Sequence, residues 1–339
     1  MNVVEKLYTE WAWRSKTGTP NISNPEDKLI LDNLINELVG PFNEEQVIFE
    51  GTQNYDAVII PKLIQDGFME EGGSIPLSEG NYKIPTKNGG NFTEQVSAKD
   101  MSIWKALWSV KPPTAKGESD NLGVGKGEIS LYWLYNYNKN RPVEVGEGRA
   151  GDDPDLNFPD CGVEVKAYNS GTAAISLGRF SADKLNLQLL SVAFGLNTLT
   201  NVLNPKSEAK VINPTNFNGK ELLPVFEAVA KFTALDNLDE LAQQYGVFKT
   251  IKDNTQFLVK ELGGVSNTLE ASKAMATKIL EAKLSRKPGD GGYLTNVTSK
   301  GGMHWWNINI SKIKASESLL SNFTVNQSKI KLNFSKVLS

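Results

Sequence analysis

The chain has 339 residues, enough for one elaborated domain or two. Hydrophobic residues make up 40% and charged residues 22%, as in ordinary soluble globular proteins, and the formal net charge of −3 gives no support for a protein that coats nucleic acid. The single histidine, His304, excludes zinc sites built on two or three histidines, and the single cysteine, Cys161, excludes an internal disulfide and favours a reducing compartment.

The first third of the chain is expected to hold helices and irregular segments. No run of about 18 apolar residues occurs in the chain, so we expect no membrane span. The first residues also lack the basic and then apolar layout of a signal peptide. Ser23, Asn24 and Pro25 form a typical helix start. We predict helices over 1–15, 25–40 and 100–109, strands at 46–50 and 57–60, and a long irregular loop over 71–95.

The middle of the chain predicts an α/β core. Residues 116–127 are rich in glycine and predict a loop, which leads into an apolar helix over 128–136. Strands are predicted near 142–148, 153–158 and 163–168, followed by a helix over 181–202. This order of elements favours a mixed sheet flanked by helices.

Three segments describe the expected organisation. Residues 1–114 are an N-terminal helical and irregular elaboration, and residues 115–205 are the core. Residues 206–339 are expected to pack on the core, first as helices over 216–286 and then as a β-rich tail over 291–338.

The short strand at residues 163–167 carries two opposite charges on one face. Residues two apart on a strand share a face, so Glu164 and Lys166 project together while Val163 and Val165 point into a core. A hairpin turn at residues 159–162 would bring Asp155, on the preceding strand, beside Glu164. Asp160 is the alternative carboxylate, but it falls in the turn itself, and hairpin geometry therefore favours Asp155.

These residues suit metal-assisted hydrolysis of a phosphodiester. Such a reaction needs charge neutralisation on the phosphate and a more acidic water, and Mg²⁺ held by carboxylates supplies both. A nearby lysine can orient or deprotonate the water. Alternatively, Glu164 and Lys166 form only a solvated salt bridge. A further acid, Glu128, opens the predicted helix over 128–136, where its charge could simply complement the helix dipole.

The stretch from Pro154 and Asp155 through the hairpin to Glu164 and Lys166 resembles the PD-(D/E)XK nuclease superfamily. The resemblance covers roughly residues 120–205. It implies a restriction-endonuclease-like α/β fold with a mixed central sheet flanked by helices. It also implies a Mg²⁺ site, with Mn²⁺ as a substitute, in which Asp155, Glu164 and the helix residue Glu128 bind the metal. The same resemblance makes Asp155, Glu164, Lys166 and Glu128 the catalytic residues.

Two further basic residues are candidate contacts to substrate phosphate. Lys126 lies in the glycine-rich loop, and Arg179 follows the strand that carries Lys166. A plain connector and an ordinary surface arginine are the alternative interpretations of these two positions.

The sequence thus favours a Mg²⁺-dependent endodeoxyribonuclease with DNA as its partner. The alternative is a non-catalytic structural or DNA-binding assembly protein, such as a phage particle component, that retains a nuclease-like core. The sequence leaves open whether the substrate is DNA or RNA and whether cleavage is endonucleolytic or exonucleolytic. It also leaves open the oligomeric state, which could be a homodimer. We expect a cytoplasmic protein, in the host cytoplasm or the virion if it is phage-encoded, since residues 8–20 are similar to phage-encoded stretches.

Overall fold

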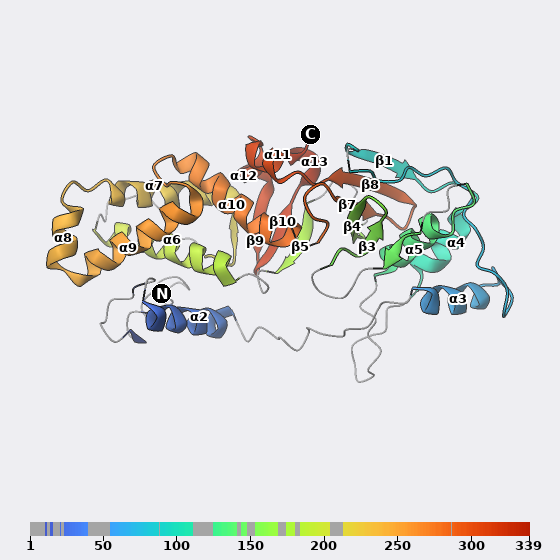
Figure 1. Cartoon of the computed structure of the whole chain (residues 1–339), viewed down its shortest axis with the longest axis horizontal. Coiled ribbons are helices and arrows are strands. Elements are labelled where there is room, and N and C mark those ends of the chain that lie inside the picture. Colours follow the sequence, from blue (N-terminus) through green and yellow to red (C-terminus); the bar gives the residue numbers. More distant parts are fainter. Residues whose placement is uncertain are drawn as a thin grey trace. The chain divides into compact units, whose positions relative to one another are not determined.

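The computed structural model of the chain divides into two compact units (Figure 1). Unit 1 comprises Met1–Asn43, Ser176–Ala282 and Ser311–Ser339, and unit 2 comprises Glu44–Ile175 and Lys283–Ile310. Both units are discontinuous in the sequence. The three segments predicted from the sequence, 1–114, 115–205 and 206–339, are each continuous and do not correspond to these units. The structure describes residues 11, 14, 15, 21, 24–39, 55–87, 89–110, 125–140, 144–147, 153–168, 174–179, 184–203, 213–285 and 287–339.

Unit 2 is built on a mixed six-stranded sheet, so the predicted α/β class is confirmed. The parallel pair is β4 with β7, and the other neighbours run antiparallel. A parallel pair requires a crossover connection, and here that connection contains the whole 176–282 segment of unit 1. In spatial order the strands are β1 (Phe92–Gln95), β8 (Gly302–Asn307), β7 (Tyr293–Val297), β4 (Cys161–Lys166), β3 (Leu156–Phe158) and β2 (Gly146–Glu147).

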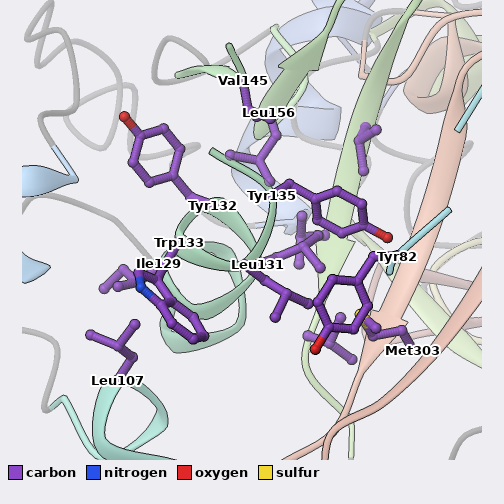
Figure 2. Close-up of a cluster of buried hydrophobic side chains, with 14 of the residues drawn as sticks. Tyr82, Leu107, Ile129, Leu131, Tyr132, Trp133, Tyr135, Val145, Leu156 and Met303 are labelled. Carbon is purple, nitrogen blue, oxygen red and sulfur yellow. The ribbon is translucent and has the colours of Figure 1, made fainter. Parts of the chain in front are cut away.

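A buried helix supports this sheet. In α5 (Lys126–Asn136) every residue from Ile129 to Tyr135 is buried, because the helix is apolar all round and is covered on several sides. Figure 2 shows Tyr135 of α5 beside Tyr82, in the same apolar cluster as Met303 of β8. Two shorter helices, α3 (Asp56–Gln65) and α4 (Met101–Trp108), pack against α5.

Unit 1 is mainly helical, with a four-stranded sheet of its own in the order β5-β10-β9-β6. Its strands are β5 (Ile175–Arg179), β6 (Phe217–Asn218), β9 (Phe323–Asn326) and β10 (Lys329–Leu332). Its helices are α2 (Pro25–Val39), α6 (Lys184–Leu203), the 3-10 helix η3 (Gly219–Glu221), α7 (Leu222–Thr233), α8 (Leu238–Gln244), α9 (Gly246–Leu262), most of α10 (Thr268–Leu284), α11 (Ile310–Ala315), α12 (Leu319–Asn322) and α13 (Phe334–Val337).

The predicted elements agree with the structure in most described segments. The predicted strand at 57–60 is wrong, because these residues form the first turns of α3, which buries Ile59 and Leu63 four residues apart on one helical face. The predicted helix over 1–15 and the strand at 46–50 fall mostly or wholly outside the described residues. No helix in the described ranges is long and apolar enough to cross a membrane.

Candidate functional site

The β3–β4 hairpin places Asp155 beside the charged strand. Leu156 pairs with Val163, so Asp155, one residue earlier, stands opposite Glu164 in the continued register. The Oδ2 atom of Asp155 accepts a hydrogen bond of 2.7 Å from the backbone amide of Val165. The hydroxyl of Tyr55 in turn donates to the carbonyl oxygen of Asp155 at 3.0 Å. Both bonds fix the aspartate at the end of the hairpin.

Glu164 and Lys166 share one face of β4, as the alternation of the strand predicts. The Lys166 ammonium donates a hydrogen bond to Oε1 of Glu164, and the Glu164 side chain is only 6% exposed. Val163 and Val165 face the opposite way and belong to the apolar core of unit 2. The ion pair is therefore held at the edge of a packed interior and is not a solvated surface pair.

Glu128 lies in the first turn of α5 and contributes a third carboxylate. Its carboxylate accepts a hydrogen bond from the amide of Gly125, the residue that caps the helix. A Cβ at Gly125 would come within 2.8 Å of Oε1 of Glu128, so a side chain at that position would crowd this contact. Burial and the charge of Asp155 raise the pKa of Glu128 to about 8.

The acids and the lysine of this site act on one another electrostatically. Burial raises the pKa of Glu164, and Asp155 adds to the effect, while Lys166 opposes it. Burial lowers the pKa of Lys166, but Glu164 and Asp155 outweigh it and leave that pKa above its ordinary value. Lys166 is therefore a cation at neutral pH, next to the buried carboxylate of Glu164 and the partly exposed carboxylates of Glu128 and Asp155.

One oxygen of Glu164 is left without a partner. Oε1 receives Lys166, whereas Oε2 is buried and accepts no hydrogen bond from any described residue. A buried carboxylate oxygen without a donor costs free energy, and such an atom is a position where a cation or a donor from a ligand is favourable.

Two residues that the motif did not indicate also belong to the site. Tyr55 is fully buried, and burial followed by the charges of Glu128 and Asp155 raises its pKa far above the ordinary value. Lys287 follows residues 176–282, the segment of unit 1 that interrupts unit 2 in the sequence. Its Nζ lies 3.8 Å from Oε1 of Glu164. No sequence pattern links either residue to the strand motif, because both contacts depend on tertiary packing.

The other sequence candidates lie in different surroundings. Lys126 is exposed at the start of α5, and its Nζ lies 5.6 Å above the ring of Trp108, a cation–π distance. Arg179 ends β5, which continues into unit 1, and its side chain lies outside the described residues. Asp160 is exposed in the hairpin turn.

The described residues contain no group of three or more histidine, cysteine, aspartate or glutamate side chains arranged to hold a metal ion. The carboxylate of Asp155 is close enough to raise the pKa of both Glu128 and Glu164, but the Glu164 carboxylate is turned to Lys166. Their chemistry still fits a hard divalent cation, because such ions prefer carboxylate oxygens and Oε2 of Glu164 is a buried one without a partner.

Comparisons with known proteins identify no relative of this chain. No protein-family model, no curated protein and no solved structure matches the chain. The interpretation of the site therefore depends on its residues alone.

Proposed function

We propose that this chain is a metal-dependent nuclease that hydrolyses phosphodiester bonds of DNA, with its site on the β3–β4 hairpin and the start of α5. One observation carries the proposal: Glu128 from a helix, Asp155 at the start of the hairpin, and Glu164 and Lys166 from β4 converge, with Lys166 bonded to Glu164 and the charge of Asp155 acting on all three. Buried charged groups that converge in this way are costly to the fold, and such clusters concentrate at functional sites.

The side chains would divide the work of hydrolysis between them. Lys166 holds a positive charge beside Glu164, where it can orient a water molecule and stabilise the charge that develops on a phosphate oxygen. Asp155 is held rigidly by the amide of Val165, so its other oxygen keeps a fixed direction. Glu164 presents the unpartnered Oε2.

Mg²⁺, with Mn²⁺ as a substitute, would be held by Asp155, Glu164 and Glu128, and when bound it would lower the pKa of a water molecule and neutralise phosphate charge. Glu164 could offer its unpartnered Oε2 while Oε1 keeps its bond to Lys166, and Glu128 would have to be ionised.

The resemblance to the PD-(D/E)XK nuclease superfamily supports the same function. We propose that the six-stranded sheet of unit 2 is a restriction-endonuclease-like core. The arrangement of α5, followed by the β2–β3–β4 meander and then by β7 parallel to β4, supports this proposal. In this proposal the core continues beyond residue 205, because β7 and β8 complete its sheet.

Cleavage assays test the function directly. The purified protein is incubated with circular and linear DNA in Mg²⁺, in Mn²⁺ and in EDTA, and the products are separated by electrophoresis. We expect cutting with either metal, none in EDTA and none by Lys166→Ala. Opening of the circular DNA identifies an endonuclease, whereas loss of the linear DNA alone identifies an exonuclease. Absence of cutting with every metal contradicts the proposal.

A second candidate is a non-catalytic assembly or DNA-binding protein that retains a nuclease-like core. The bond between Lys166 and Glu164, together with the missing three-ligand arrangement within the described ranges, favours it. Gel-shift titration with labelled DNA separates the two. Metal-independent binding without cleavage supports the assembly protein, and metal-dependent cleavage excludes it.

A further inference from the structure

A tight turn after the long insertion carries Lys287 to β4. Pro288 is buried, and the amide of Gly289 donates to the carbonyl oxygen of Leu284 at 3.0 Å. The turn lies so close to the hairpin that a Cβ at Gly162 would come within 3.0 Å of the Pro288 carbonyl oxygen. The backbone at Lys287 is therefore fixed relative to β4, and its position beside Glu164 does not result from a loose surface chain.

The Lys287 ammonium is only loosely engaged with Glu164. Its Nζ is 3.8 Å from Oε1, beyond hydrogen-bond distance, whereas Lys166 makes a hydrogen bond to the same oxygen. The Lys287 side chain is 35% exposed, against 23% for Lys166. Lys287 thus makes no hydrogen bond to Glu164 and is the more exposed of the two lysines, at the rim of the site.

The charges of the site indicate what this rim lysine would meet. The carboxylates of Glu128, Asp155 and Glu164 act on the ammonium of Lys166, and the ammonium of Lys287 lies near Glu164. With all five ionised the site has a charge of −1, and a divalent cation would change it to +1. A polyanionic substrate is then attracted, and a partly exposed ammonium at the rim is the group that reaches its phosphates first.

We propose that Lys287 binds a backbone phosphate of the nucleic-acid substrate next to the bond that is cut, a role that rests on the proposed nuclease function. The tight turn positions its ammonium, and Glu164 holds it near the site until the substrate arrives. Lys287 therefore contributes to substrate binding, whereas Lys166 contributes to the chemical step.

Steady-state cleavage kinetics of a short fluorescein-labelled DNA duplex in Mg²⁺, over a series of salt concentrations, test this role. For Lys287→Ala we expect a rise of about tenfold in KM and a change of less than about threefold in kcat. The plot of log(1/KM) against log salt has a negative slope, and its magnitude should decrease by about one because one phosphate contact is lost. Lys287→Arg should recover most of the loss, because a guanidinium also binds phosphate.

The matched control is Lys300→Ala, which removes an exposed lysine from the β7–β8 turn of the same unit. Its KM and salt slope should equal those of the wild type. A Lys287→Ala protein with unchanged KM and slope, or with only a lower kcat and weaker apparent Mg²⁺ affinity, overturns the phosphate role and leaves the nuclease function standing. A wild-type protein that does not cleave the duplex overturns both.

Discussion

The carboxylate of Asp155 accepts a 2.7 Å hydrogen bond from the amide of Val165, the residue between Glu164 and Lys166. This bond continues the β3–β4 pairing one step past its last regular pair, Leu156 with Val163. The side chain of Asp155 takes the place of a backbone carbonyl as the acceptor. The hydrogen bond that closes the open end of the β3–β4 pairing therefore also fixes the Asp155 carboxylate. The geometry distinguishes Asp155 from Asp160, which is exposed in the turn.

Replacement of Asp155 by asparagine should remove metal-dependent cleavage and leave the fold intact. The amide oxygen of asparagine can still accept from Val165, but the negative charge is lost. We expect activity to fall by at least about a hundredfold, as when a catalytic charge is removed, with an unchanged circular dichroism spectrum. The control Asp160→Asn should cleave like the wild type. Equal loss in both variants, or loss in Asp160→Asn alone, contradicts the assignment.

Removal of Lys166 should destabilise the protein, because it leaves the buried Glu164 without its closest cation. For Lys166→Met we expect a loss of roughly 1–3 kcal/mol in the free energy of unfolding at neutral pH, measured by urea denaturation. The loss should shrink toward acidic pH, since Glu164 can then take up a proton.

The double variant Glu164→Gln/Lys166→Met tests whether the two residues are coupled. Its loss of stability should be smaller than the sum of the single losses, because neither charge is then left alone. Lys300→Met, at an exposed position, should cost little. Additive single losses would show that the pair is not coupled.

The local chemistry of the strand could be predicted from the sequence because it depends on short-range geometry. Strand alternation places Glu164 with Lys166, and hairpin register places Asp155 opposite Glu164. The apolar run 128–136 predicts a helix, and α5 covers Lys126–Asn136. These relationships involve neighbours on one element or two elements joined by a tight turn.

The remainder depends on contacts between distant segments. Nothing in the sequence pairs β4 with β7, because a parallel partner can follow a crossover of any length, and this crossover contains most of unit 1. In the sequence Lys287 stands only among the basic residues that follow a helical segment, and its place beside Glu164 follows from that pairing. Tyr55 likewise reaches Asp155 through packing.

The close approach of the Lys287 turn to the hairpin should make Gly162 intolerant of a side chain. A Cβ there would lie 2.8 Å from Cγ of Pro154 and 3.0 Å from the carbonyl oxygen of Pro288. We expect Gly162→Ala to cost about 1–3 kcal/mol in thermal or urea unfolding, as overpacking does. Gly146→Ala is the control, since its Cβ would meet Asn157 at an ordinary 3.4 Å. Equal stability of the two variants would contradict this packing.

The pKa of Glu128 gives a prediction about stability and pH. Its folded-state pKa is about 8, against an ordinary value of 4.5, chiefly because of burial and next because of Asp155. Between these values the unfolded chain releases a proton that the folded protein retains. The contribution of Glu128 to the free energy of unfolding is therefore fully present below pH 4.5 and is lost as the pH rises toward 8.

Glu128→Gln should remove this loss, because a neutral amide of the same shape has no proton to release and can still accept from the Gly125 amide. Without added metal, the variant should exceed the wild type in stability by roughly 1–3 kcal/mol at pH 8, given ~1.4 kcal/mol per pKa unit. The difference should be near zero at pH 4 and grow as the pH rises. Glu71→Gln, at an exposed position, should show no such trend. Urea denaturation across this pH range measures both, and a difference for Glu128→Gln that is flat or falls with pH would show that Glu128 is not a buried, neutralised acid in the folded protein.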